Sequence, residues 1–368
     1  MITDLLTLTP EAARAAIAEW LAARGSGGVG GVGGVGEAEP SYRLRQILPR
    51  LWARPVAAWT DATELPAALR EALQDAFPLT RLELAAHQVS EDGTEKFLWK
   101  LADQEAIESV LIPEGKRRTL CISSQVGCAL GCVFCATGRM GWRRNLSPAE
   151  IAGQVREVVL RDAALKPTNV VFMGMGEPLL NWEHVDAALT ILNQREGLGI
   201  GARHITVSTV GILPNLAKFA RRPEQFRLAV SLHAPTPAQR LALMPIEKKY
   251  ALTDVLAALR QFRRRVTLEY VLIAGHNDSL QTADALACLA GPLGALVNLL
   301  PLHPGGSPGL APSPRPQMLA FERRLRRHGV EAVLRRSRGL DISAACGQLR
   351  VELGPRPEVG TQEHARVE

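Results

Sequence analysis

The chain has 368 residues, of which 46% are hydrophobic and 22% charged, a balance that excludes a disordered chain and is typical of a globular protein. No run approaches the roughly 20 consecutive apolar residues of a membrane helix, and the N-terminus lacks a signal-peptide pattern, so we expect a cytoplasmic protein that does not bind a membrane. The formal net charge of +6 favours contacts with phosphate groups, although a genome rich in Arg codons would produce the same excess.

The first part of the chain predicts a small α+β accessory domain, residues 1–105. The expected helices lie at about 10–24, 42–53 and 64–77, and the strand-like pieces at about 79–88, 96–101 and 108–112. Residues 25–36, GSGGVGGVGGVG, carry no side chains that bury a core, so we expect a flexible segment there.

From Thr119 onward, apolar strands alternate with amphipathic helices. The six expected strands lie at 119–124, 169–174, 204–209, 226–233, 266–273 and 295–303. Six strand-then-helix units predict an α/β fold, either a partial (β/α)6 barrel or, as the alternative, an open doubly wound sheet. We assign residues 106–353 to this domain, with its chemistry at the carboxyl ends of the strands. The tail, 354–368, is expected to be disordered.

Three cysteines at C-x3-C-x2-C spacing follow the first strand of the expected barrel: Cys128, Cys132 and Cys135. Three thiolates can bind three irons of a 4Fe-4S cluster and leave the fourth iron open for a substrate, whereas a ferredoxin closes its cluster with a fourth cysteine. A structural zinc site, the alternative, usually takes four ligands in C-x2-C pairs. The spacing therefore favours a cluster with an open iron.

Polar residues at the ends of the later strands are candidate ligand contacts. The turn Met173-Gly-Met-Gly-Glu-Pro178 offers Gly176 for close backbone approach and Glu177 as an acceptor for an ammonium group, although an ordinary Gly-rich turn has the same composition. The other candidates follow later strands: Ser208, Ser231, Leu232, His233 and Asn298. Because parallel strands end at one face, we expect these residues to line one mouth.

The remaining cysteines lie outside the C-x3-C-x2-C motif. Cys121 lies on the strand that leads into the cluster loop, and Cys346 lies in the segment AACGQL. The small neighbours of Cys346 suit a reactive thiol and, equally, a small buried residue. Cys288 lies on the apolar helical segment LACLAG, where we expect it to be part of the core.

These motifs, with the segments IESVLIPEGKRRTLCISSQVGCALGCVFCATG, NVVFMGMGEPLLN and DISAACGQL, closely resemble the RlmN/Cfr family of radical S-adenosylmethionine (SAM) RNA methyltransferases, and most closely its RlmN branch. The resemblance covers roughly residues 38–351. It implies a radical SAM barrel, a 4Fe-4S cluster with SAM on its open iron, and an electron donor such as flavodoxin. The implied reaction is methylation of carbon 2 of an adenosine in 23S rRNA and of an adenosine in tRNA.

The same resemblance implies residue roles. Cys346 matches a cysteine that first takes a methyl group from SAM, Cys121 matches a cysteine that helps to release the adduct through a transient disulfide, and Glu108 matches a proton acceptor. Cys128, Cys132 and Cys135 match the cluster ligands, and the SAM contacts are matched by Gly176, Glu177, Ser208, Ser231, Leu232, His233 and Asn298. Carbon 2 of adenine is not nucleophilic, which explains the need for a radical route with covalent catalysis.

Other functions stay open at this stage. Methylation of carbon 8 of the same rRNA adenosine, as in the Cfr branch, uses the same cysteines, but the general similarity, including ATGRMGWRRNL, favours carbon 2. An iron–sulfur electron carrier would need a fourth cluster ligand and no SAM site. Trp142 beside Arg143 and Arg144 suggests an RNA contact that combines stacking with positive charge.

Overall fold

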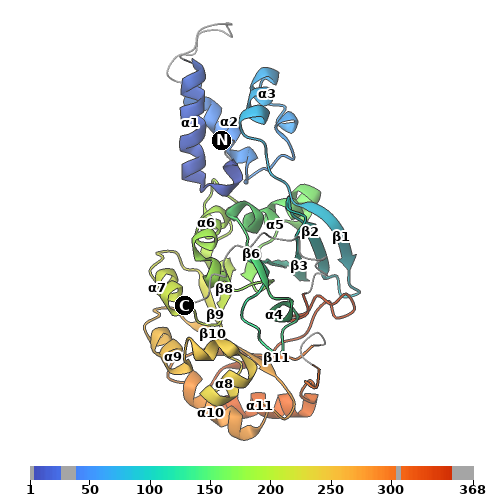
Figure 1. The fold of residues 1–368 in the computed structure, drawn as a ribbon, viewed down its shortest axis with the longest axis vertical. Coiled ribbons are helices and arrows are strands. Elements are labelled where there is room, and N and C mark those ends of the chain that lie inside the picture. The colour runs from blue at the N-terminus through green and yellow to red at the C-terminus, as the bar shows by residue number, and fades with distance from the viewer. Residues whose placement is uncertain (1–3, 26–38, 304–307, 350–368) are drawn as a thin grey trace, which may run out of the picture.

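The computed structural model describes residues 4–25, 39–303 and 308–349 of the chain. The predicted disordered tail and nearly all of the predicted flexible segment at 25–36 lie outside the described residues. Figure 1 shows an elongated molecule, with the first helices at one end and the sheet with its surrounding helices in the larger body.

The N-terminal helices pack together at one end of the molecule (Figure 1). The bounds are Pro10–Gly25 for α1, Glu39–Ile47 for α2 and Ala67–Ala76 for α3, close to the predicted positions. Trp52 and Trp59 are fully buried in this part of the core, and the indole N–H of Trp59 donates to the carbonyl of Phe77 at 2.7 Å. We refer to α1, α2, α3 and the turns between them as the helical cap.

Buried Arg156 joins the helical cap to α5 (Pro148–Arg161). Its guanidinium donates to the carbonyls of Leu51, at 2.9 Å, and Val56, and lies 3.4 Å from the carboxylate of Glu157. Burial lowers the pKa of Arg156 to about 10, and the Glu157 charge opposes that shift. Because a buried cation is costly without such partners, this contact fixes the cap on the barrel.

Ten strands form one sheet, in the order β1-β2-β3-β4-β7-β8-β9-β10-β11-β12. Their bounds are Glu83–Val89, Glu95–Lys100, Ala106–Glu114, Arg117–Cys121, Asn169–Phe172, Ile205–Thr209, Arg227–Ser231, Val266–Leu272, Leu296–Pro301 and Ala332–Leu334. The strands β1 to β4 pair antiparallel, and every pair from β4 to β12 is parallel. The six predicted strands are thus confirmed as neighbours in chain order, which is the order of a (β/α)6 barrel and lacks the reversal of a doubly wound sheet.

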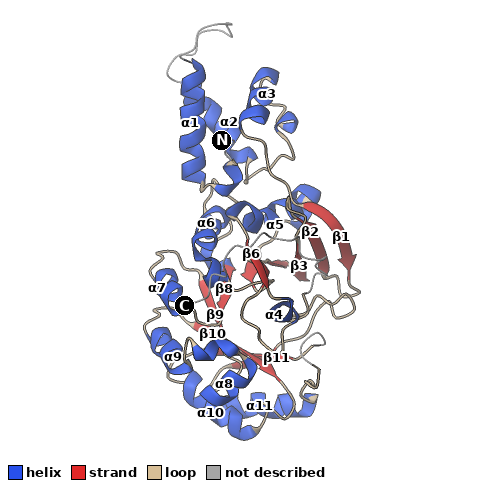
Figure 2. Ribbon diagram, viewed as in Figure 1, coloured by secondary structure: helices blue, strands red, loops and turns tan. Residues whose placement is uncertain are grey.

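Helices alternate with the parallel strands and lie around the sheet, as Figure 2 shows. After α5, their bounds are Trp182–Asn193 for α6, Leu213–Ala220 for α7, Pro237–Leu243 for α8, Leu252–Arg260 for α9, Leu280–Ala290 for α10 and Arg315–Arg327 for α11. These helices bury apolar side chains such as Leu189, Leu259 and Phe321. The alternation places the carboxyl ends of the parallel strands at one mouth.

Two strands of the predicted accessory domain belong to the main sheet. β2 pairs with β3 and β1 with β2, so the hairpin β1–β2 extends the barrel sheet at the side opposite β12. The part of the N-terminal region that stands apart in Figure 1 is the helical cap. The division of the chain into domains at residue 105 stays a prediction.

Small elements around the cluster loop escaped prediction. Strands β5 (Gln125–Gly127) and β6 (Trp142–Asn145) form a separate antiparallel pair, and the short helix α4 (Ala136–Met140) lies between them in the chain. Together they hold both ends of the loop that carries the three cysteines.

The expectation that Cys288 is a core residue is wrong. Cys288 lies on α10 with its side chain exposed. The buried stripe of this helix runs through Ala283, Leu286, Ala287 and Ala290, one turn apart along the helix. Cys288 lies off that stripe, so the apolar composition of LACLAG conceals a helix with two different faces.

Candidate active site

The three cysteines of the C-x3-C-x2-C motif lie on one loop between β5 and α4. Cys128 and Cys132 are buried and Cys135 is half-buried. Burial raises the pKa of Cys128 to about 12, and burial followed by the nearby Cys135 and Cys128 thiols raises the pKa of Cys132. The three thiols are therefore close enough to influence one another electrostatically.

Glycine at position 127 is required by the shape of this loop. Gly127 has φ +72°, and a Cβ there would lie 1.9 Å from the carbonyl oxygen of Gly141. That same carbonyl accepts from the backbone N–H of Cys128 at 2.9 Å, which closes the base of the loop. The loop thus places Cys128 at the end of the β5–β6 pair. The backbone conformation at position 127 that allows this is one that only glycine adopts without a clash.

The residues around the loop fit an iron–sulfur cluster. Arg240 on α8 is fully buried and lies near enough to Cys132 to lower the pKa of that thiol, against the larger effect of burial. Among the described residues, the Nε–H of Arg240 has no hydrogen-bond partner. A buried cationic donor beside the thiols suits an anionic cluster. In the described ranges, no three His, Cys, Asp or Glu side chains converge closely enough to ligate a single metal ion. A 4Fe-4S cluster does not require this, because each of the three thiolates binds a different iron.

The Gly-Glu turn after β7 packs against the loop that leads to the cysteines. Gly176 has φ +99°, and a Cβ there would lie 2.6 Å from the side chain of Gln125. The carboxylate of Glu177 is buried and accepts from the backbone N–H groups of Leu179 and Val210, each at 3.0 Å. Burial raises the pKa of Glu177 to about 7, although these hydrogen bonds oppose the shift. These bonds fix the Glu177 carboxylate between its own turn and the residue that follows β8.

Three polar residues on β9, β10 and β11 lie in one row: Ser231 ends β9, whereas Glu269 and Asn298 lie within β10 and β11 and not at the strand ends that the sequence predicted for Asn298. Glu269 on β10 is the register partner of Ser231 on one side and of Asn298 on the other. The amide of Asn298 donates to Glu269 Oε1 at 2.9 Å, and burial raises the pKa of Glu269 to about 7. Sequence reasoning named Ser231 and Asn298 but missed Glu269, although a single acid inside the apolar run VTLEYVLI was a usable signal.

His233 connects this row to the cluster loop. Its backbone is left-handed, with φ +55°, and its Nδ1 accepts from the backbone N–H of Val271 at 3.0 Å. The imidazole packs edge-on against Phe134 of the cluster loop, with ring centroids 4.6 Å apart. Burial, followed by the charge of Arg240, lowers the pKa of His233 to about 3, so the ring is neutral. Because Nδ1 is the acceptor for Val271, the single proton of the neutral ring lies on Nε2.

Two further predicted contacts, Ser208 and Leu232, are both buried. Ser208 lies on β8. Its register partner is Ala229 on β9, the strand that carries Ser231. Leu232 is buried, and its backbone N–H donates to the carbonyl of Glu269 at 3.1 Å. Leu232 therefore offers backbone and packing, and its side chain lies in the core.

The structure brings the two further cysteines into the same site. Cys121 ends β4, where burial raises the pKa of its thiol and the nearby Cys346 raises it further. Cys346 is exposed. The protein atoms packed around its thiol raise the pKa of Cys346, and the charge of Glu269 raises that pKa further. Two cysteines from distant parts of the sequence thus face the same mouth.

Glu108 lies on β3, two residues before Val110, which is the register partner of Cys121. Its carboxylate is buried and lies 3.2 Å from the ammonium group of Lys96 on β2. The carbonyl of Glu108 accepts from Ser123 Oγ at 2.6 Å, and that hydroxyl accepts from Met175 N at 2.9 Å. These bonds connect β3 with the turn that carries Glu177.

The basic residues beside Trp142 are already engaged with acids. Trp142 is exposed, as a stacking residue requires. Arg143 lies 3.5 Å from Glu105, and Arg144 forms two hydrogen bonds of 2.8 Å with Glu150. Arg144 therefore has a structural role at the start of α5, which weakens the expectation that it binds phosphate.

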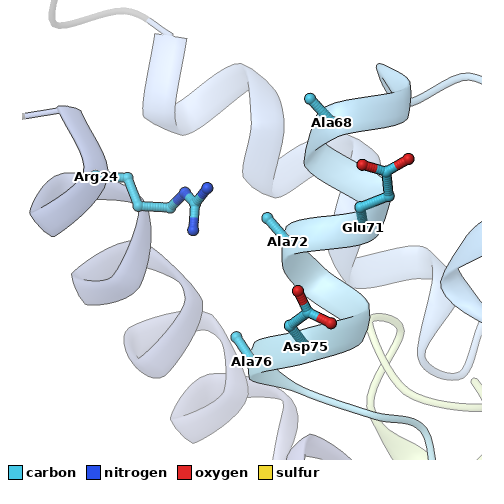
Figure 3. Close-up of a pocket in the computed structure, with 6 residues that line it drawn as sticks. All are labelled: Arg24, Ala68, Glu71, Ala72, Asp75 and Ala76. Carbon is cyan, nitrogen blue, oxygen red and sulfur yellow. The ribbon is translucent and has the colours of Figure 1, made fainter. Parts of the chain in front are cut away.

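A groove of about 410 Å³ lies away from this site, between α1 and α3. Figure 3 shows Arg24 of α1 directed toward α3, which carries Glu71 and Asp75 along this side. The rest of the lining consists of alanines, so the groove offers little chemistry. None of the predicted site residues lines it, and the candidate active site stays at the barrel mouth.

Comparison with known proteins agrees with the barrel and its cysteine loop. Residues 122–286 match the model of the radical SAM superfamily. The chain is 55% identical over 368 residues to the probable dual-specificity RNA methyltransferase RlmN of Gemmatimonas aurantiaca, covering 100% of this chain and 99% of that protein. It is 46% identical over 329 residues to the dual-specificity RNA methyltransferase RlmN of an Anaeromyxobacter species, covering 86% and 87%.

A solved structure shows the same fold. The crystal structure of a radical SAM methyltransferase from Sphaerobacter thermophilus superposes with a TM-score of 0.84 at 41% sequence identity. The match covers 95% of this chain and 99% of that one. The similarity therefore includes the helical cap and the β1–β2 hairpin as well as the barrel.

Proposed function

The chain belongs to the RlmN family of radical SAM RNA methyltransferases, and on that basis we propose that it methylates carbon 2 of one adenosine in 23S rRNA and of one adenosine in tRNA. It is a SAM-dependent RNA methyltransferase that uses a 4Fe-4S cluster. The observation that carries the proposal is that Cys346 lies close enough to Cys121 to raise the pKa of that thiol, on a segment that is hydrogen-bonded to the start of α4. An enzyme that used SAM only for direct displacement would need neither thiol.

The target carbon explains why two thiols are needed. Carbon 2 of adenine is not nucleophilic, so direct displacement on SAM fails there. When bound, SAM and the cluster supply the methyl group and the radical that activates it. Cys346 is the proposed methyl carrier, and Cys121 is the thiol that pairs with Cys346 to release the product, leaving a transient disulfide. Covalent catalysis of this kind divides one difficult step into easier ones.

The other residues hold the reactants or move protons. Cys128, Cys132 and Cys135 are the proposed cluster ligands. Glu108, kept beside Lys96, is the proposed proton acceptor. The proposed SAM contacts are the polar and backbone groups at the mouth: Gly176, Glu177, Ser208, Ser231, Leu232, His233 and Asn298. The row Ser231–Glu269–Asn298 supports this assignment, because it places three polar side chains at one level on neighbouring strands.

We propose the cytoplasm as the site of action and a reduced electron carrier such as flavodoxin as the electron donor, because radical cleavage of SAM requires one electron. In the described part of the chain, no helix has both the length and the apolar composition to cross a membrane. The proposed division is an accessory region, residues 1–105, that docks RNA, followed by the catalytic region. The exposed Trp142 supports an RNA surface at the mouth.

The test is a reaction with defined RNA. The protein is reconstituted anaerobically with iron, sulfide, SAM and a reductant, incubated with unmodified 23S rRNA and tRNA, and the nucleosides are analysed by mass spectrometry. We expect 2-methyladenosine from both RNAs, and none with Cys346→Ala. Formation of 8-methyladenosine would replace the carbon 2 assignment with carbon 8. The absence of any methylated adenosine from an enzyme that cleaves SAM would contradict the substrate assignment.

A further inference from the structure

The segment that carries Cys346 is fixed on its C-terminal side to the start of α4. The backbone N–H of Ala136 donates to the carbonyl of Gly347 at 2.9 Å, and the hydroxyl of Thr137 donates to the carbonyl of Leu349 at 2.7 Å. Because α4 begins directly after the cluster loop, these two bonds hold the reactive thiol beside that loop.

On its N-terminal side, the same segment is fixed to the turn between β1 and β2. Ser90 Oγ donates to Asp341 Oδ1 at 2.6 Å across 251 positions of sequence, and the backbone N–H of Glu91 donates to Asp341 Oδ2 at 3.2 Å. In the opposite direction, the backbone N–H of Gly339 donates to Asp92 Oδ2 at 3.1 Å. The contact is therefore reciprocal, with one carboxylate from each side.

The backbone of the segment is shaped to this turn. Gly339 has φ +60°, and a Cβ there would lie 2.8 Å from the Cβ of Ala344 and 3.0 Å from the side chain of Thr94. Ser343 has φ +52°, a left-handed conformation that is unfavourable for a residue with a side chain. A segment that pays such a cost keeps its shape only while neighbouring contacts hold it.

The anchored segment exposes its cysteine. Ala344 and Ala345 are buried, whereas Cys346 is exposed. The contacts at the β1–β2 turn and at α4 therefore fix the backbone on both sides and leave the thiol at the mouth, near Cys121 and Glu269.

We infer that Ser90 and Asp92 are positioning residues for Cys346, which they hold at the mouth through Asp341 and Gly339. This inference rests on the proposed role of Cys346 as the methyl carrier. A thiol that serves first SAM and then RNA must stay within reach of both, and a small misplacement of a reacting group costs a large factor in rate. The β1–β2 hairpin thus takes part in methyl transfer without touching either substrate.

The test compares matched variants of the anaerobically reconstituted holoenzyme. Ser90→Ala removes the hairpin side of the contact and Asp341→Ala the segment side. Glu91→Gln changes the exposed neighbour, whose backbone N–H makes the contact, and serves as the control. Alkylation by iodoacetamide is followed by peptide mass spectrometry, and the exposed Cys288 on α10 is the internal reference for any general loss of structure.

We expect the ratio of Cys346 to Cys288 alkylation to rise roughly tenfold or more in both variants, since a hydrogen bond to a charged group is lost and the thiol leaves the surroundings that raise its pKa. Glu91→Gln leaves the ratio unchanged. In a parallel experiment, incubation with SAM without RNA measures methylation of Cys346, which we expect to slow by a similar factor in both variants.

Three results would overturn the inference: an unchanged alkylation ratio in both variants, an equal rise with Glu91→Gln, or a raised ratio with methylation of Cys346 at the wild-type rate. A wild-type enzyme that transfers no methyl group to Cys346 would instead contradict the proposed function, and the alkylation ratio would still decide whether the hairpin holds the segment. The double variant Ser90→Ala/Asp341→Ala provides a further check: because the two side chains form one hydrogen bond, the effect of the double variant on the alkylation ratio should be smaller than the two single effects combined.

Discussion

Replacing Gly127 or Gly141 by alanine separates backbone strain from collision at the cluster loop. The two glycines have nearly the same φ, +72° and +74°, and they face each other across the end of the β5–β6 pair. A Cβ on Gly141 meets nothing within 4 Å, whereas a Cβ on Gly127 would lie 1.9 Å from the carbonyl oxygen of Gly141. The two substitutions therefore differ in one respect, which is the space available for the added methyl group.

The structure sets the size of the two effects. Left-handed backbone costs alanine roughly 1–2 kcal/mol at either position. At Gly127 the collision is with backbone, so the loop must shift, which adds roughly 1–3 kcal/mol or more. We expect Gly141→Ala to lower the free energy of unfolding by about 1 kcal/mol and Gly127→Ala by about 3 kcal/mol or more.

Two assays check this expectation. Urea unfolding measures the stability of each variant, and the iron and sulfide content after anaerobic reconstitution measures whether the displaced loop still holds a cluster. We expect Gly141→Ala to keep nearly the full iron content and Gly127→Ala to lose most of it. Equal stability and equal iron content in the two variants would refute the argument that the Gly127–Gly141 contact shapes the loop.

Two further predictions concern buried charge. Because burial raises the pKa of Glu269 from 4.5 to about 7, this group stabilises the folded state below its unfolded pKa and loses that contribution as the pH rises through about 7, a change of about 3 kcal/mol. Glu269→Gln in the cluster-free protein should therefore flatten the fall in stability between about pH 4.5 and 7, and a slope equal to that of the wild type would contradict the burial of this carboxyl. Arg156→Met should lower the free energy of unfolding by roughly 3 kcal/mol, because the carbonyls of Leu51 and Val56 lose their buried donor; limited proteolysis that cuts the helical cap no faster than in the wild type would argue against its anchoring role.

Much of the architecture followed from local patterns in the sequence. The six parallel strands were predictable because each is an apolar run followed by an amphipathic helix, and their order follows from the chain. The cysteine loop was predictable because its ligand spacing lies within eight residues, Cys128 to Cys135. The β5–β6 pair and β12 were missed because strands of three or four residues give no usable periodicity.

The features that could not be predicted from the sequence depend on contacts between distant segments. The place of Glu269 between Ser231 and Asn298 is a matter of register across three strands, which a single strand does not encode. The contact of Asp341 with Ser90 joins residues 251 positions apart. Cys288 was misassigned because composition alone does not tell which face of an apolar helix is buried.

The chemistry assigned to the two thiols leads to one direct measurement. If Cys121 helps to release the product from Cys346, then Cys121→Ala, reconstituted and supplied with SAM, reductant and RNA, should stop after the carbon–carbon bond has formed. We predict a covalent protein–RNA adduct that, after nuclease and protease digestion, leaves an adenosine attached through one carbon to the sulfur of Cys346. Full turnover by Cys121→Ala without an adduct, or an adduct on any other residue, would contradict the proposed path of the methyl group.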